Sequence, residues 1–141
     1  MLIKKRVKSL LLVICLCMAS NNALASNSSV QGKIKRLIKT TEERYGIPSG
    51  LLEAIAFVES GINNHAISVA GKPVIATNNK EALKVIADAQ ENGIRNIDVG
   101  VMQLNYRFHS KAFANIQEML NPKNNIEYAA KLLISKKKQH G

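Results

Sequence analysis

The chain has 141 residues, of which 46% are hydrophobic and 21% are charged, and its formal net charge is +10. A chain of this length forms one domain with a modest hydrophobic core and leaves no room for a second domain. The positive charge favours an anionic partner, but basic and aromatic residues are not interleaved, which argues against nucleic acid.

Residues 1–25 have the pattern of a secretory signal peptide. Basic residues in the first eight positions precede a short apolar stretch, Leu10 to Met18, and Ala23-Leu24-Ala25 supplies the small-x-small cleavage pattern. An N-terminal membrane anchor is the alternative, but it would need a longer apolar stretch. We therefore expect cleavage before Ser26, export to the periplasm or cell envelope, and no stable membrane span in the mature domain, residues 26–141.

Two segments with helical spacing follow the signal peptide. The first is a helix ended by Gly46, whose inner face consists of Ile34, Leu37, Ile38, Thr41 and Tyr45. The second opens at Ile47-Pro48, with proline in its first turn, and ends at Gly61. Its apolar stripe consists of Leu52, Ile55 and Ala56.

Glu59 is the candidate catalytic acid because the helical repeat places it within that apolar stripe. Apolar surroundings favour the protonated form of a carboxylate, which is the form that a general acid needs to protonate a glycosidic oxygen. The alternative is a last-turn residue that reaches out to a lysine or to a helix cap. Glu53 falls on the opposite side of the helix, where a solvated carboxylate is expected.

The middle of the chain predicts a small β-hairpin and a third helix. Residues 66–69 and 73–77 are rich in β-branched types, and Ala70-Gly71-Lys72 between them forms the turn. Asn78 and Glu81 have capping-box spacing and open a helix that ends at Gly93. A loop from residue 94 to residue 105 comes next.

The last part of the chain predicts a short helical piece at residues 113–120 and a final helix. Asn121 caps this helix, Pro122 lies in its first turn, and its inward residues are Ile126, Ala129, Ala130 and Leu133. Together the elements predict a mainly α domain with a small β-hairpin.

The segment from Asp98 to Asn105 combines a flexible glycine, an apolar pair and the side-chain amides of Gln103 and Asn105. Such a segment suits a cleft wall that hydrogen-bonds sugar hydroxyl and acetamido groups. The alternative is a buried loop in which the two amides satisfy backbone groups.

Three motifs resemble those of lytic transglycosylases of the soluble type. Residues 45–48 leading to Ile55–Gly61 resemble the helix that presents their catalytic Glu-Ser pair, and Gly100-Val101-Met102-Gln103 differs by one residue from their Gly-Leu-Met-Gln motif. Residues 121–133, with Asn125-Ile126, resemble their following helix. The longer segment 97–105, with the hairpin and helix before it, is most similar to the branch that accompanies conjugation and type IV secretion machines.

The resemblance implies a lysozyme-like helical domain whose cleft binds peptidoglycan glycan strands. Glu59 would protonate the bond between N-acetylmuramic acid and N-acetylglucosamine, then help the muramyl 6-hydroxyl attack and leave a 1,6-anhydro end. Ser60, Gln103 and Asn105 would hold the sugar, Met102 would line the cleft, and Tyr106 would stack nearby. Asp98 could be the second carboxylate of a hydrolytic lysozyme, although its place beside the loop favours a role in tying down backbone amides.

No cofactor or metal is expected. Cys15 and Cys17 lie in the signal peptide, and His65, His109 and His140 lack metal-ligand spacing.

Members of the resembled family continue into further helices with an Ala-Tyr-Asn-like segment that closes the cleft, whereas this sequence ends at Gly141. The domain is therefore expected to be C-terminally incomplete or a minimal version. The alternative function is a non-catalytic peptidoglycan-binding or secretion-assembly module.

Overall fold

The computed structural model describes residues 29–140, so the expected signal peptide, residues 1–25, lies outside the described residues. Residues from Ile34 onward belong to one compact unit, which contains the elements discussed below. Within the described part of the chain, no helix combines the length and the apolar character needed to cross a membrane.

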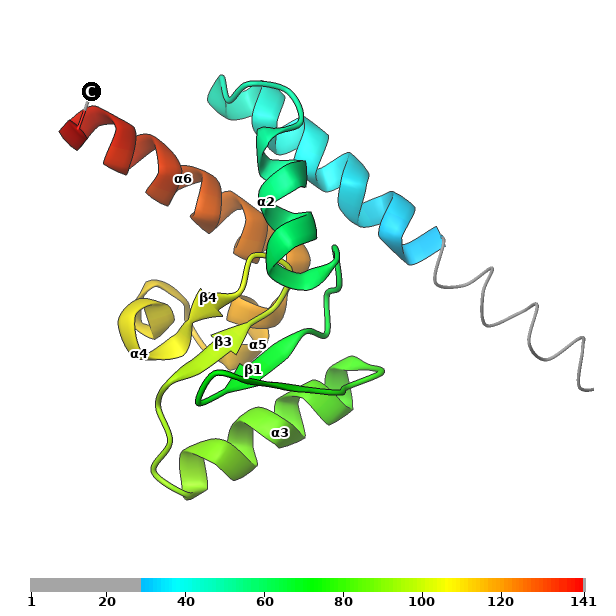
Figure 1. The fold of residues 1–141 in the computed structure, drawn as a ribbon, viewed down its shortest axis with the longest axis vertical. Coiled ribbons are helices and arrows are strands. Elements are labelled where there is room, and N and C mark those ends of the chain that lie inside the picture. Colours follow the sequence, from blue (N-terminus) through cyan, green and yellow to red (C-terminus); the bar gives the residue numbers. More distant parts are fainter. Residues whose placement is uncertain (1–28, 141) are drawn as a thin grey trace, which may run out of the picture. The chain divides into compact units, whose positions relative to one another are not determined.

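Helices dominate this unit, with a small antiparallel sheet between them (Figure 1). A first helix covers residues 29–45, and its residues 34–45 belong to this unit. The labelled helices are α2 (Leu51–Ser60), α3 (Asn79–Glu91), α4 (Tyr106–His109), α5 (Ile116–Leu120) and α6 (Pro122–His140), with a 3₁₀ turn at Ser110–Ala112. The strands are β1 (Ile67–Val69), β2 (Lys72–Val74), β3 (Ile97–Val99) and β4 (Leu104–Asn105). This arrangement confirms the predicted fold class, a mainly α, lysozyme-like domain with a small hairpin.

The sheet contains the predicted hairpin and two strands that were predicted as a loop. Its order is β2-β1-β3-β4, with every neighbouring pair antiparallel. Ala70 and Gly71 form the hairpin turn with φ of 51° and 79°, as a two-residue turn requires. The prediction of a continuous loop over residues 94–105 was wrong, because strands of three and two residues are too short to show a period of two.

The predicted cap of α3 is confirmed. The Asn78 side chain accepts from the Glu81 N–H at 3.0 Å, and the Glu81 carboxylate accepts from the Thr77 N–H at 2.8 Å. Ala82 and Ile86 then lie fully buried on the side of α3 that contacts β1. The bond from the Glu81 N–H to Asn78 is thus as predicted, whereas the Glu81 carboxylate accepts from the N–H of Thr77 rather than from that of the cap residue Asn78.

The start of α2 differs from the prediction. The helix begins at Leu51, after Gly50 in a left-handed conformation, and Pro48 lies outside it. Gly50 has no side chain with which to cap the helix, so Glu42 of the first helix takes that role. Its carboxylate accepts from the N–H groups of Gly50 at 2.9 Å and Leu52 at 2.7 Å. This buried contact fixes α2 against the preceding helix.

The final helix, α6, begins where it was predicted. Asn121 accepts from the Lys123 N–H at 3.0 Å, and Ile126 and Ala130 are fully buried. Arg44 of the first helix forms an ion pair with Glu127 at 2.6 Å. The core therefore joins the first helix, α2 and α6 to the inner face of the sheet.

Candidate active site

Glu59 lies in the last turn of α2 and its side chain is exposed, so the prediction that it is buried in an apolar stripe was wrong. The helical repeat does bring it into line with Leu52, which is buried. The last turn, however, faces an open pocket rather than packed side chains. Periodicity gives the direction of a side chain but not what lies in that direction.

The pocket beside Glu59 has a volume of about 330 Å³ and is built by three parts of the chain. The end of α2 contributes Glu59 and Ser60, the turn after β3 contributes Gln103, and the hairpin region supplies an apolar wall. Ile75 in that wall is 92% exposed. The pocket thus places one carboxylate and the two amides of Asn63 and Gln103 beside apolar surface, which is the lining expected for a small polar ligand with apolar faces.

Ser60 connects the end of α2 to the turn that carries Gln103. Its hydroxyl donates to the Val101 carbonyl at 2.7 Å and accepts from the Asn63 N–H at 3.1 Å. Its hydrogen-bonding capacity is largely used inside the protein. Ser60 lines the pocket but acts first as a link between two segments 41 residues apart in sequence.

Gln103 lines the pocket from a strained position, with φ of 46°. Its side-chain nitrogen donates to the carbonyls of Ala66 at 2.9 Å and Gly100 at 3.0 Å. Because these bonds use the nitrogen, the side-chain oxygen is the atom suited to accept a hydrogen bond from a ligand. A non-glycine residue held at positive φ in this way is common at functional sites.

Asn125 of α6 holds the same turn from the buried side. Its side chain accepts from the Met102 N–H at 2.8 Å and donates to the carbonyls of Val99 and Met119, each at 2.9 Å. Gly100 is essential to this contact, because a Cβ there would lie 2.9 Å from the Asn125 nitrogen. From the sequence, Asn125 was recognisable only as part of a motif. A polar residue within the apolar stripe of α6 was the signal for its role.

Met102 and Asn105 occupy places different from those that the resemblance implied. Met102 is 6% exposed and belongs to the core. The Asn105 side chain donates to Asp98 and to Asn96, each at 2.8 Å, and accepts from the Arg107 N–H at 3.1 Å. Asp98 therefore stabilises this region through a side-chain amide, and Asn105 satisfies groups of the protein itself.

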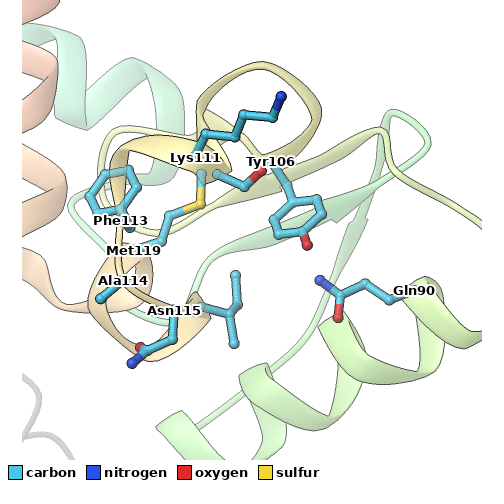
Figure 2. A pocket seen from close by; sticks show the side chains of 9 residues that line it. Gln90, Tyr106, Lys111, Phe113, Ala114, Asn115 and Met119 are labelled. Carbon is cyan, nitrogen blue, oxygen red and sulfur yellow. The ribbon is translucent and has the colours of Figure 1, made fainter.

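Tyr106 lines a different pocket, which Figure 2 shows, with Gln90 of α3 across from it. The structure thus brings Glu59, Ser60 and Gln103 together and places Tyr106 apart from them. Among residues 29–140, no three His, Cys, Asp or Glu side chains gather closely enough to hold a metal ion.

Residues 36–141 match the family model of the Transglycosylase SLT domain. Protein IpgF of Shigella flexneri and Protein IpgF of Shigella sonnei are each 42% identical to the chain over 96 residues. The match covers 64% of this chain and 48% of each relative, so the chain spans about half the length of the curated relatives it matches. The chain has no clear match among solved structures.

Proposed function

Because the chain belongs to the transglycosylase SLT family, we propose that it cleaves the β-1,4 bond between N-acetylmuramic acid and N-acetylglucosamine in peptidoglycan, with Glu59 as acid and base. The observation that carries this proposal is the shared pocket of Glu59 and Gln103, with an apolar wall beside them. Peptidoglycan as a substrate and the signal-peptide pattern of residues 1–25 together support export to the periplasm or cell envelope.

The proposed reaction needs only one carboxyl group. The Glu59 carboxyl donates its proton to the glycosidic oxygen as the bond from that oxygen to the muramyl C1 breaks. The muramyl 6-hydroxyl then attacks C1 and returns its proton to the Glu59 carboxylate. The product has a 1,6-anhydro end, no water is consumed, and the carboxyl is restored.

Because Glu59 is exposed in the free protein, the bound glycan itself would change the hydration of its carboxylate. A sugar in the pocket replaces the water around the carboxylate, and the wall that includes Val74 and Ile75 surrounds the remaining side with apolar atoms. Loss of hydration favours the protonated carboxyl, the form that donates. Gln103 would orient the sugar through its side-chain oxygen. Ser60, through its hydrogen bond to the Val101 carbonyl, would hold the turn that carries Gln103 next to Glu59.

The test is digestion of purified sacculi followed by mass spectrometry of the released muropeptides. Wild type should release 1,6-anhydro muropeptides, and Glu59→Gln should lower the rate at least about a hundredfold, within the range of general acid catalysis. Glu53→Gln is the matched control, because Glu53 lies on the same helix in a solvent-accessible ion pair with Lys35. Products with reducing ends would instead indicate hydrolysis, with Asp98 as the candidate second carboxylate.

A non-catalytic peptidoglycan-binding or secretion-assembly module is the second candidate, and the exposure of Glu59 favours it. This candidate predicts sedimentation with sacculi that is equal for wild type and Glu59→Gln, with no release of muropeptides by either. The similarity of residues 97–105 to the branch that accompanies conjugation and type IV secretion supports a partner in such a machine. Co-purification of the exported chain with the assembled machine tests that partner.

A further inference from the structure

An apolar groove of about 390 Å³ lies where the turn before α2 meets the last part of α6, and it shares no lining residue with the pocket of Glu59. The turn contributes Ile47 and Pro48, α2 contributes Leu51, and α6 contributes Leu133 and Ile134. Apart from two lysines, every side chain that lines the groove is apolar. The groove therefore offers a ligand hydrophobic surface but no side-chain amide, hydroxyl or carboxyl group.

The two lysines that line this groove are Lys136 and Lys137, near the end of α6. Both are exposed, and neither forms a salt bridge within residues 29–140. A lysine can lay its methylene stem along an apolar wall while its ammonium group stays in water. The groove thus combines an apolar floor with two cationic groups, and this combination is complementary to an amphiphile with an anionic head group.

Exposed apolar surface continues from the groove along the outer side of α2. Leu51 is 40% exposed, and Val58, two turns further on and in line with it, is 81% exposed. Exposed Ala54 lies between them, so that Leu51, Ala54 and Val58 form an outer row, and Phe57 beside this row is 68% exposed. Seven residues of helix span about 10 Å. The outer row therefore extends well beyond the groove and indicates contact with an extended surface.

We propose that the groove and the outer row of α2 bind the surface of an anionic phospholipid membrane, with lipid phosphate groups held by Lys136 and Lys137. A bilayer surface supplies both components that this face requires, apolar acyl chains and a layer of anionic head groups. A second copy of the chain fits less well, because a symmetric contact would bring the same lysines together. An extended peptide also fits less well because, apart from the lysines, no lining side chain can pair with its backbone groups. The membrane contact does not depend on cleavage by Glu59.

The experiment uses tryptophan fluorescence, because the sequence contains no tryptophan and a single introduced indole reports on its own surroundings. Val58→Trp in the full chain places the indole on the outer row of α2, and Phe108→Trp, at a 71% exposed position on α4, is the matched control. The probe is a vesicle of equal parts phosphatidylglycerol and phosphatidylcholine. On these vesicles the Val58→Trp emission should shift to shorter wavelength and be quenched by brominated acyl chains, whereas Phe108→Trp should show neither change.

The role of the lysines is tested by titrating the same vesicles into chains that carry Val58→Trp. Lys136→Gln combined with Lys137→Gln should weaken binding about thirtyfold, since each lysine near an anionic membrane surface contributes about a fivefold gain in affinity. Lys80→Gln combined with Lys111→Gln removes the same charge at exposed positions outside the groove. This control should have a much smaller effect, because salt screens charges that lie away from the contact.

Unchanged Val58→Trp emission on the vesicles, equal shifts at both tryptophans, or equal losses from both lysine pairs would overturn the proposal. A shift that depends on protein concentration without vesicles, together with a dimer in analytical ultracentrifugation, would identify a second copy as the occupant instead. A shift caused by an acidic amphipathic peptide but not by the vesicles would identify a protein partner. Either of these results contradicts the membrane contact, and release of muropeptides from sacculi tests the proposed cleavage separately.

Discussion

At the scale of single residues, the buried polar side chains are the ones that shape the candidate site. Asn125 is fully buried and Glu42 is 3% exposed, whereas Glu59 is exposed. A buried polar group is costly unless its hydrogen bonds are made, and both buried residues make theirs to backbone groups. Asn125 orders the turn beside the pocket, and Glu42 orders the start of α2, whose last turn carries Glu59.

Replacing Asn125 with alanine should lower the free energy of unfolding by about 2–4 kcal/mol, because the Met102 N–H and two carbonyls lose a buried partner. Urea unfolding followed by circular dichroism measures the change. Asn125→Asp should be no better, since it keeps an acceptor for Met102 but cannot donate to the two carbonyls. Asn92→Ala, at the exposed end of α3, is the control and should change stability by less than about 0.5 kcal/mol.

Gly100→Ala and Gly93→Ala separate backbone strain from a steric clash. Both glycines have positive φ, 78° and 73°, but only at Gly100 would a Cβ meet another side chain. Gly93→Ala should cost about 1–2 kcal/mol from its backbone conformation alone. Gly100→Ala should cost about 2–5 kcal/mol, because the clash with Asn125 adds to the strain. Equal unfolding free energies for the two variants would contradict the close approach of Asn125 to Gly100.

At the scale of elements, the long helices were predictable and their contacts were not. The cap of α3 follows from Asn78 and Glu81, and that of α6 from Asn121, because these signals are local in sequence. The start of α2 was missed because its cap comes from Glu42, which lies eight residues before Gly50 on another helix. Long-range capping of this kind leaves no signal in the spacing of the capped helix.

Glu42, like Glu59, lies in line with the apolar stripe of its helix. Glu42 falls beside Ile38 and Thr41 on the inner face of the first helix, and it is the carboxylate that the structure buries there. A charged residue in an apolar helix stripe predicts either that its side chain is buried or that it faces a functional pocket. The neighbouring elements decide between burial and a pocket, and the sequence of the helix does not show them. The grouping of Glu59, Ser60 and Gln103 in one pocket was therefore predictable only in part. The position of Tyr106 in a different pocket was not predictable.

The Glu42 cap can be measured by substitution on the first helix. Glu42→Gln should lower the free energy of unfolding by about 1–2 kcal/mol, because a neutral amide accepts more weakly than a carboxylate from the N–H groups at the start of α2. Glu43→Gln is the control, since Glu43 is the exposed neighbour. Amide hydrogen exchange should quicken at Leu52 in Glu42→Gln only, and unchanged exchange there would contradict the cap.

At the scale of the whole molecule, stability should depend on the protonation of His109. Its ring lies 3.2 Å from the Tyr128 hydroxyl, and burial, followed by the charge of Lys136, lowers the pKa of His109 below its usual 6.5. In the unfolded chain His109 binds its proton near pH 6.5, so the unfolded state takes up more protons as the pH falls. The stabilising contribution of neutral His109 is therefore complete above pH 6.5 and is lost as the pH is lowered through that value.

Unfolding free energies measured between pH 8 and pH 5 test this dependence. The excess stability of wild type over His109→Gln should shrink as the pH falls below about 6.5. NMR titration of the His109 ring protons gives the direct readout, with a midpoint expected below that of an unfolded histidine. A midpoint at or above 6.5 would contradict the role of burial.

The hydrogen bonds of Asn125 also constrain the order in which the protein can mature. The turn that presents Gln103 is built from residues 99–103, yet its buried amide partner arrives only 23 residues after Met102. A nascent chain can therefore form the hairpin and α3 while this turn is still unsupported. The pocket beside Glu59 is completed only when α6 docks, so a partly synthesised chain carries the Glu59 carboxylate without the ordered turn that places Gln103 beside it.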